Sequence, residues 1–509
     1  MFDKIKSFFR KVGITLGLIQ EYNQLNEHKK IDISDKAYER IAANKQIYSG
    51  FVKNWHRISY LNSNGEQRQR DMMTLGMGKI AANKMAKLIF NEKCDIDVSS
   101  VEGDGEDLAA EFVNDTLYRN NFNRDFQRYL EYCYALGGMA MKVYEHDGLI
   151  KISYATADSF IPLSNDSENV DEAIFITKEK KDKKFYTLIE WHEWEGDIYV
   201  VTNELFESAK EDKLGHKVPL SVLYPDLEEV TRIEGLDSPL FVYLKPNIAN
   251  NFDLTSPLGV SIYENSYDTL KQIDYLYDFY HHEFKLGKRR ISVNRGMTKS
   301  VINDDGTTSP VFDAEETVYV PLGIGDDDGV KDLSVGLRVT EIMTAINHQL
   351  DLLSMQMGLS SGTFTFDGRS VKTATQVISE NSETFQTKNS HETLVEQAIH
   401  DLVKAIINLA ILYGYYNGTT DIEVAVNFDD SIAEDRYNNY KYYAQAVKDG
   451  LYPKTKAIMK IFKVTEEEAK DLIEEINADR VELMQQDLEY SLDMAQVPPL
   501  NMEDDGATE

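Results

Sequence analysis

The stretch that decides the fold runs SIYENSYDTLKQIDYLYDFYHHEFK, from Ser261 to Lys285. Its large apolar and aromatic residues recur every three or four positions, which is the spacing of one face of an α-helix. At 1.5 Å of rise per residue, a helix over this stretch would be about 38 Å long. A second apolar seam runs from Val339 to Met357 in steps of three and four residues. The two stretches therefore predict a pair of long helices.

A basic cluster and two strand-like runs separate these helices. Ile291 to Asn294 and Thr317 to Pro321 are predicted strands, and they enclose a loop rich in Gly, Asp and Thr. We therefore predict a small β-hairpin module at the tip of a helical stalk. The basic cluster consists of Lys285, Lys288, Arg289, Arg290, Arg295 and Lys299. It is either a solvated helix end, where cations complement the helix dipole, or a local contact for phosphate or a partner protein.

Helices and short strands flank the stalk in the sequence. Helices are predicted from Glu66 to Glu92 and from Phe122 to Leu136, the second ending at Gly137, a residue type that tolerates the left-handed C-cap conformation. Short β-branched and aromatic runs between Ala140 and Thr202 predict an antiparallel sheet. A very long helix is predicted from Lys372 to Tyr413. Because its first half is polar and its second half has an apolar face, we expect the first half to be exposed to solvent and the second half to be packed against the rest of the fold.

The C-terminal part continues the mixture of helices and strands. It predicts a strand from Ile422 to Phe428, a helix from Ser431 to Asp449 and another from Thr465 to about Gln486. Thr465 and Glu468 fit a capping box at the start of the last helix. An acidic tail follows, with no basic residue after Arg480. The fold class is therefore α+β and mainly helical.

Composition limits the functions open to the chain. Its 509 residues include 86 Asp and Glu against 54 Lys and Arg, a net charge of −32. Proteins that grip nucleic acid through its phosphates usually carry a basic surplus, because binding displaces condensed counterions. A DNA-coating protein is therefore not expected. Cys94 and Cys133 are too few for a disulfide framework, which indicates a reducing compartment.

Neither the N-terminus nor any apolar run indicates a membrane. The N-terminal stretch MFDKIKSFFRKVGITLGLIQ is basic and amphipathic, but it lacks the uninterrupted apolar core of a secretion signal. The longest apolar run, Ala405 to Tyr416, falls well short of the roughly 20 residues that a membrane span needs. We therefore expect a soluble protein.

No motif indicates catalysis, a cofactor or a metal, because GxSxG, HExxH and P-loop patterns are all absent. Gly76 to Ala81 matches a dinucleotide-binding pattern but lies inside a predicted helix with no strand before it. His281 to Glu283 is expected on an exposed helix surface, and Asp326 to Asp328 lacks the donor spacing of a calcium loop. Trp191 to Trp194 is expected to pack as a strand. An acidic-residue hydrolase and a monomeric helical scaffold or adaptor are the alternatives.

Several motifs occur in a distinctive order. They are Ala135-Leu-Gly-Gly-Met-Ala-Met-Lys142, Ala157-Asp-Ser-Phe-Ile-Pro162, Tyr186-Thr-Leu-Ile-Glu-Trp-His-Glu-Trp194, Pro239-Leu-Phe-Val-Tyr-Leu-Lys-Pro246, Ser256-Pro-Leu-Gly-Val-Ser261 and Lys372-Thr-Ala-Thr-Gln-Val377. In this order, from about residue 30 to about residue 480, the chain resembles the portal proteins of tailed bacteriophages, specifically the SPP1-type family.

The resemblance implies a ring, usually of twelve subunits, at one capsid vertex, through which double-stranded DNA is packaged and later ejected. It also implies a division of the chain. The parts would be an N-terminal arm (1–60), a wing (61–260), a first stem helix (261–286), a small β-hairpin clip (287–334), a second stem helix (335–357), a tunnel loop (358–371), a wing helix and strand (372–429), and a crown with an acidic tail (430–509).

The resemblance implies partners as well, in the host cytoplasm during assembly and then in the virion. The terminase large subunit would dock at the clip, followed by a head-completion adaptor, and the major capsid and scaffolding proteins would surround the ring. The expected clip contacts are Lys288, Arg289, Arg290, Arg295 and Lys299. The tunnel-loop residues expected to face the duplex are Ser360, Ser361, Thr363, Phe364, Asp367, Arg369 and Lys372. Acidic walls would keep the duplex from sticking.

Overall fold

The computed structural model describes the chain from residue 35 to residue 477, with gaps. The described residues are 35–62, 65–100, 108–164, 170–211, 213–287, 291–292, 299–302, 306, 308–311, 331–332, 336–366, 382–428, 436–462, 469–470, 472–474 and 476–477. They belong to two compact units. The larger unit holds the described residues up to 428, and the smaller unit holds those from 436 onward.

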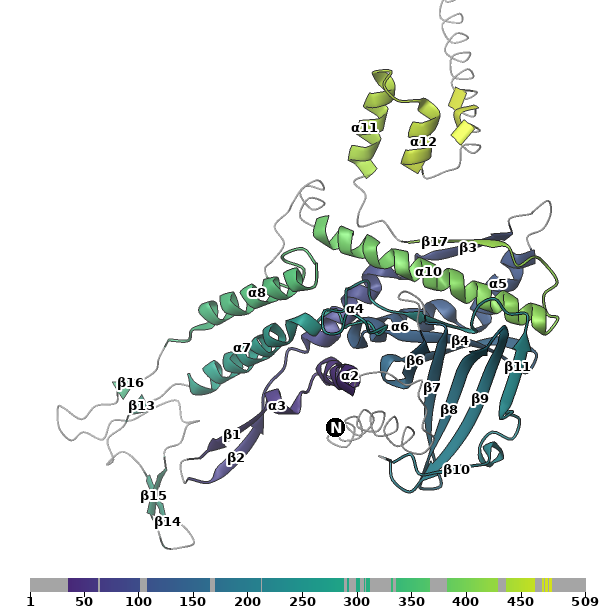
Figure 1. Cartoon of the computed structure of the whole chain (residues 1–509). Helices are drawn as coiled ribbons and strands as arrows, with labels where there is room; N and C mark the ends of the chain where they lie inside the picture. Colours follow the sequence, from purple (N-terminus) through teal and green to yellow (C-terminus); the bar gives the residue numbers. More distant parts are fainter. Residues whose placement is uncertain are drawn as a thin grey trace, which may run out of the picture. The chain divides into compact units, whose positions relative to one another are not determined.

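Two long helices pack against each other in the larger unit (Figure 1). They are α7 (Tyr267–Leu286) and α8 (Val339–Gln356). The apolar seam predicted for the second helix is confirmed, because Ile342, Ile346 and Leu350 are buried. The first helix begins six residues later than predicted. Turn residues and a short 3-10 helix, η3 (Glu264–Ser266), precede it.

Short antiparallel strand pairs lie between these two helices in the sequence. β13 (Ile291–Ser292) pairs with β16 (Lys331–Asp332), and β14 (Lys299–Ile302) pairs with β15 (Thr308–Val311). β13 lies within the predicted strand from Ile291 to Asn294, whereas the β14–β15 hairpin was not predicted. The predicted strand from Thr317 to Pro321 and the acidic run from Asp326 to Asp328 lie outside the described residues.

The N-terminal part of the larger unit differs from the prediction. Its elements are α2 (Asp35–Tyr48), α3 (Lys53–His56), β1 (Arg57–Leu61), β2 (Gln67–Asp71) and α4 (Met77–Ile89). The helix predicted from Glu66 to Glu92 is therefore wrong from residue 66 to residue 76. β2 pairs with β1 over five residues, and α4 begins only after Gly76, whose φ of 68° is left-handed. Gly76 to Ala81, which match the dinucleotide-binding pattern, therefore span the start of α4 and do not lie inside a longer helix.

The next elements agree better with the sequence. β3 (Asp95–Ser100) and α5 (Leu108–Arg119) lead to α6 (Phe122–Leu136), which ends at Gly137 with φ 94°, as predicted. The strand predicted from Ile422 is confirmed as β17 (Ile422–Asn427). It pairs antiparallel with β3, more than 300 residues earlier in the chain.

The strands between residues 139 and 244 form two sheets where the sequence predicts one. The first has the order β12 (Phe241–Leu244), β4 (Met139–His146), β5 (Leu149–Thr156). The second has the order β10 (His216–Val218), β9 (Ile198–Ser208), β8 (Lys184–Glu195), β7 (Glu172–Lys181), β6 (Phe160–Ser164), with β11 (Val230–Glu234) also paired to β9. The short helix η1 (Ala157–Ser159) separates the sheets in the sequence, and η2 (Leu220–Val222) follows β10. All pairings are antiparallel, as predicted.

The helix α10 (Ser382–Leu412) is packed along both halves. Its second half buries the expected apolar face, including Leu402, Ile406 and Leu409. Its polar first half is exposed on one side, at residues such as Gln386 and Asn389, and buried on the other, so the predicted solvent-exposed environment holds for one side of the described part. The predicted residues 372–381 lie outside the described residues. Lys388 is only 1% exposed and pairs with Glu392 one turn later at 2.5 Å, which removes both charges from water together.

The smaller unit contains two described helices. α11 (Arg436–Lys448) confirms the helix predicted from Ser431 to Asp449, within its described part. α12 (Lys454–Phe462) follows Pro453 and was not predicted. The predicted capping box at Thr465 and Glu468 lies outside the described residues.

Candidate functional site

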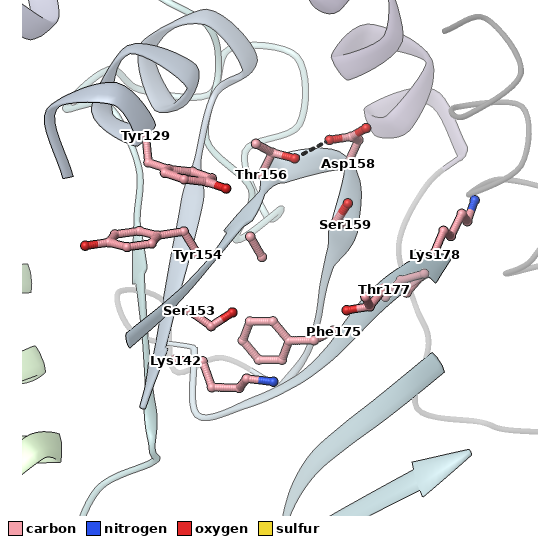
Figure 2. Close-up of a pocket in the computed structure, with 12 residues that line it drawn as sticks. Tyr129, Lys142, Ser153, Tyr154, Thr156, Asp158, Ser159, Phe175, Thr177 and Lys178 are labelled. Carbon is pink, nitrogen blue, oxygen red and sulfur yellow. Dashed lines mark hydrogen bonds between the residues drawn. The ribbon is translucent and has the colours of Figure 1, made fainter. Parts of the chain in front are cut away.

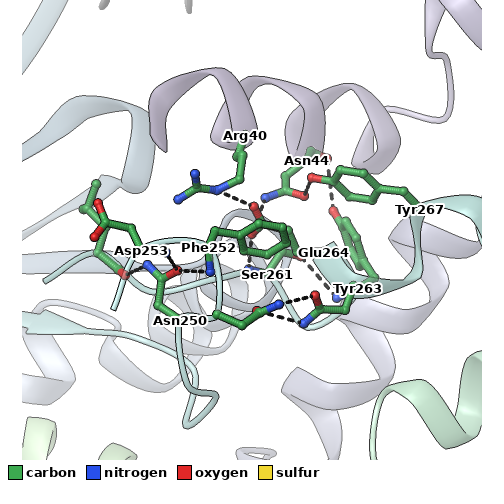
Figure 3. A network of polar contacts seen from close by, with 12 residues as sticks. Arg40, Asn44, Asn250, Phe252, Asp253, Ser261, Tyr263, Glu264 and Tyr267 are labelled. Carbon is green, nitrogen blue, oxygen red and sulfur yellow. Dashed lines mark hydrogen bonds and ion pairs between the residues drawn. The ribbon is translucent and has the colours of Figure 1, made fainter. Parts of the chain in front are cut away.

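The start of helix α7 is fixed to helix α2 by one buried carboxylate (Figure 3). Glu264 is 4% exposed, and its Oε1 is 2.9 Å from Nε of Arg40. Its Oε2 accepts hydrogen bonds from Asn44 Nδ2 (3.2 Å) and from the Ser261 amide (3.0 Å). The hydroxyl of Tyr263 donates to the backbone oxygen of Asn44 at 3.0 Å. Residues more than 200 positions apart therefore hold the start of α7 in place.

The middle of α7 carries a second buried carboxylate, Asp274. It accepts hydrogen bonds from His56 Nε2 (3.0 Å), Thr74 Oγ1 (2.9 Å) and the Leu75 amide (2.8 Å). Nδ1 of His56 accepts the amide hydrogen of Val52, so the ring proton lies on Nε2, facing Asp274. Asp274 thus joins the segment before α4 to α7.

One turn further along α7, Asp278 binds the β1–β2 hairpin. Arg70 on β2 donates two hydrogen bonds of 2.7 Å to its two carboxylate oxygens, and the Met73 amide donates a third at 3.1 Å. Burial acts to raise the pKa of Asp278, but the hydrogen bonds from Arg70 and Met73 outweigh it and the pKa is lowered. The carboxylate therefore stays charged in the folded chain at neutral pH.

The far end of α7 is joined to the beginning of α8. Glu283 accepts hydrogen bonds from the Arg338 amide (3.1 Å), Nε (3.2 Å) and Nη2 (2.8 Å). These bonds lower the pKa of Glu283. Glu283 is buried, so the exposed position expected for it is wrong, whereas His281 beside it is exposed. A Cβ on Gly287 would lie 2.1 Å from Leu337 Cδ2, so the two chain segments approach each other closely here.

The described part of the predicted tunnel loop, 358–366, is anchored on both neighbouring helices. Ser360 is 2% exposed, and its Oγ accepts the amide hydrogen of Thr384 on α10 at 3.1 Å, while its own amide donates to Thr384 Oγ1 at 2.9 Å. On the α8 side, Asp351 accepts hydrogen bonds from Ser361 Oγ (2.9 Å) and the Gly362 amide (2.8 Å). Ser360 is therefore an internal anchor of the loop.

The other predicted contact residues have different placements. Ser361 is exposed, Thr363 and Phe364 are half-buried, and Phe364 packs against the core. Lys299 lies on β14. The remaining residues predicted for the loop and the clip lie outside the described residues: Asp367, Arg369, Lys372, Lys288, Arg289, Arg290 and Arg295. The structure thus brings four loop residues together at the end of α8.

A cavity of about 290 Å³ lies between β5 and β7 (Figure 2). Its wall includes the stacked rings of Tyr129 and Tyr154, whose centroids are 4.6 Å apart. Of its charged groups, Lys142 pairs with Glu190 at 2.6 Å, and Asp158 pairs with Lys45 at 2.5 Å. Burial acts to raise the pKa of Asp158, but Lys45 outweighs it and the pKa is lowered. The lining therefore offers hydroxyl groups and ring faces rather than an acid and a base free to react.

The strand around Trp191 packs as predicted. Trp191 and His192 are both 2% exposed on β8. His192 contacts the Tyr199 hydroxyl through Nδ1 (2.7 Å) and Glu190 through Nε2 (2.8 Å). Burial lowers the pKa of this imidazole. Within the described residues, no group of three or more His, Cys, Asp or Glu side chains is arranged to hold a metal ion, and no helix is long and apolar enough to cross a membrane.

The sequence did not point to the three carboxylates that bind neighbouring segments along α7. The signal for two of them was present, because Asp274 and Asp278 are four residues apart on a helix and therefore share a face. That face continues the one marked by Leu270 and Ile273, so acidic residues interrupt a buried stripe. A buried carboxylate requires a partner, and the interruption alone could have predicted one.

Comparison with known protein families identifies the family of this chain. A family described as "Phage portal protein, SPP1 Gp6-like" matches residues 27–482, nearly the entire chain. No curated protein matches the chain. The portal family is structural and is not a known enzyme family. The resemblance seen in the ordered sequence motifs is thereby confirmed, and the chain belongs to the SPP1 Gp6-like family of phage portal proteins.

Proposed function

We propose that this chain forms a closed ring of twelve copies at one capsid vertex and that double-stranded DNA passes through the ring during packaging and ejection. Family membership implies a role in genome packaging, an oligomeric ring and association with the capsid and the terminase. The observation that carries the proposal is the α7–α8 pair with short strand pairs between the two helices, within a chain that matches the portal family over residues 27–482. Head-to-tail contacts between identical subunits generate a closed ring when the rotation between neighbours closes after a whole number of copies.

The anchors on α7 suit a part that must resist force. Glu264, Asp274 and Asp278 tie the helix to segments between residues 40 and 75, and Glu283 ties it to α8. Each bond involves a charged group, which makes it stronger than a neutral hydrogen bond. We propose that these bonds keep the stem rigid while the duplex moves, so that motion is confined to loops.

We propose that the loop around residues 358–371 faces the duplex. Ser361 is exposed there, Thr363 and Phe364 are half-buried, and Asp367, Arg369 and Lys372 complete the proposed set. Ser360 is left out of this set because its side chain is buried. Neutral hydroxyls bind phosphate weakly, and a net charge of −32 per chain opposes tight DNA binding. The channel would therefore guide DNA without holding it.

We propose that the clip, residues 287–334, receives the terminase large subunit first and a head-completion adaptor afterwards. The contact residues proposed are Lys288, Arg289, Arg290, Arg295 and Lys299, a basic cluster on an acidic chain. The chain has no P-loop, so ATP hydrolysis would come from the terminase. Assembly with scaffolding and major capsid proteins would take place in the host cytoplasm.

The size and shape of the purified particle test the ring. Twelve copies of a 58.2 kDa chain weigh about 700 kDa. We expect that mass by light scattering and an annulus with a central channel by negative-stain microscopy. A species that stays monomeric both alone and when produced together with the scaffolding and capsid proteins would overturn the proposal.

A further inference from the structure

The end of α10 leaves a group of large side chains in solvent. Up to Ala410 the apolar face of the helix is buried, but Leu412 is 47% exposed, Tyr413 49% and Tyr415 40%. Gly414, with φ 70°, turns the chain between the two tyrosines. Tyr416 next to them is buried against Phe112, with ring centroids 5.6 Å apart, which fixes the turn.

Two carboxylates accompany these side chains. The Tyr415 hydroxyl donates to Glu145 Oε1 at 3.3 Å, and the rings of Tyr413 and Tyr415 stack with centroids 5.8 Å apart. Partial burial and the charges of Glu145 and Glu228 raise the pKa of Tyr413. We call Leu412, Tyr413, Tyr415, Glu145 and Glu228 the tyrosine patch.

The chemistry of the tyrosine patch defines what would bind it. Ring faces and carboxylates attract cations, and the exposed leucine and rings attract apolar side chains. A basic amphipathic segment satisfies both requirements. The chain has such a segment at its N-terminus, FDKIKSFFRKV, residues 2–12. It holds four cations against one aspartate, within a chain whose net charge is −32.

We propose that residues 2–12 dock on the tyrosine patch of the same chain. The four basic residues would face Glu145, Glu228 and the tyrosine rings, while the phenylalanines would cover Leu412. Docking would remove from water a surface that soluble proteins rarely leave open. The proposal does not depend on the ring or on DNA, since both partners belong to one chain.

The tether is long enough for docking within one chain. The 22 residues from 13 to 34 separate the segment from α2, and extended they span about 70 Å. A chain of short contacts connects α2 to α10. The Tyr263 hydroxyl donates to the backbone oxygen of Asn44 on α2, and the amide of Ile262, the residue before Tyr263, donates to the backbone oxygen of Tyr134. The Tyr134 ring in turn lies 5.1 Å from the ring of His391 on α10. From His391 the helix rises about 33 Å to Tyr413, and α2 adds about 14 Å from Asn44 back to Asp35. Tethering also raises the effective concentration of the segment.

Site-specific photo-cross-linking of the full-length chain tests the proposal. A photoreactive phenylalanine analogue at position 9 should cross-link to residues 411–415 of the same chain, as identified by mass spectrometry of the digest. Cross-linking in a mixture of isotopically heavy and light chains distinguishes contact within a chain from contact between chains. We expect products in which both peptides carry the same isotope.

Variants of the patch sharpen the test. Tyr413→Ala/Tyr415→Ala should reduce the cross-link about fivefold or more, and Glu228→Lys should reduce it by a similar factor through charge reversal. Tyr118→Ala is the matched control, because Tyr118 is 83% exposed on α5, and it should leave the yield unchanged. Glu228 is exposed, so its replacement keeps the test valid if the double tyrosine variant fails to fold.

Three outcomes would overturn the proposal. The first is a cross-link from position 9 to other parts of the chain only. The second is a yield that neither patch variant lowers. The third is a product that joins heavy to light peptides as often as random pairing of the mixed chains predicts, which would assign the patch to a second copy instead.

Discussion

The helices α7 and α10 both bury charged side chains, but they satisfy these charges in different ways. On α7, Asp274 and Asp278 bind side chains and amides of residues 56–75, about 200 positions earlier in the chain. On α10, Lys388 and Glu392 bind each other across one turn of the same helix. The local pair follows from sequence spacing, whereas the distant bonds of Asp274 and Asp278 exist only once residues 56–75 have packed against α7. The two sets of buried charges therefore differ in whether these partners lie on the same helix or far away in the chain.

Removal of Asp274 should have the largest effect. Asp274→Ala leaves the neutral His56 ring and the Leu75 amide without their acceptor in a buried place, and two unsatisfied buried donors should together lower the free energy of unfolding by about 3–5 kcal/mol. Urea unfolding followed by circular dichroism measures the loss. Asp268→Ala is the control, because Asp268 is exposed on the same helix, and its effect should stay within about 0.5 kcal/mol. Equal losses in the two variants would contradict the role of Asp274 as an anchor.

The pair on α10 should respond differently to single and double replacement. Lys388→Met leaves Glu392 buried without its ion-pair partner and should cost about 3 kcal/mol. Lys388→Met/Glu392→Leu removes both charges and should cost about 1 kcal/mol or less, since apolar side chains often replace a buried pair with little loss. Urea unfolding of both variants gives the comparison. A double variant as unstable as the single one would show that Lys388 and Glu392 also make stabilising contacts with other segments of the fold, as Asp274 does.

Acid should weaken the α10 region through His391. Burial lowers the pKa of His391 to about 4, whereas an unfolded histidine titrates near 6.5, and its Nδ1 accepts the Asn247 amide hydrogen at 3.0 Å. The unfolded chain therefore binds a proton first, and stability falls as the pH drops from about 6.5 to about 4, by roughly 3 kcal/mol. His391→Gln should flatten this part of the stability profile, measured by urea unfolding at a series of pH values. An unchanged profile would contradict the buried neutral imidazole.

Asp278 provides the corresponding acid test on α7. Its folded pKa is lowered, so its contribution to stability is complete above the ordinary Asp pKa of 3.8 and is lost as the pH falls through the folded value. The difference in unfolding free energy between the native chain and Asp278→Asn should therefore shrink as the pH falls from 7 to below 3.8. A difference that does not change with pH would mean that Arg70 does not stabilise the charged form.

The loop anchor should show the smallest effect. Ser360→Ala and Thr384→Ala should each cost about 1 kcal/mol, and the double variant should cost less than their sum, because the two side chains bond to each other. Ser361→Ala, at an exposed position, should change stability by less than about 0.5 kcal/mol. Strict additivity of the first two changes would contradict a direct Ser360–Thr384 bond.

Periodicity alone was sufficient for some elements and misleading for others. It predicted α6 to its last residue, because an amphipathic helix followed by Gly137 carries both its face and its stop signal locally. It failed at residues 67–71, since a polar stretch beside a helical pattern becomes a strand only when β1 lies opposite. The candidate site shows the same division. Ser361 is exposed, as the polar loop predicts, but Ser360 is buried through its bonds to Thr384, 24 residues later.

The α+β class, the helix Val339–Gln356 with its apolar seam, the antiparallel strands and the family could all be predicted from the amino-acid sequence, because each of these depends on residues close together or on the order of motifs along the chain. Which charged groups are buried, and what they bind, depends instead on how distant segments pack. A carboxylate such as Asp274 can leave water only when donors meet it at hydrogen-bond distance. Those donors come from His56, Thr74 and Leu75, and nothing in the local sequence of α7 specifies them.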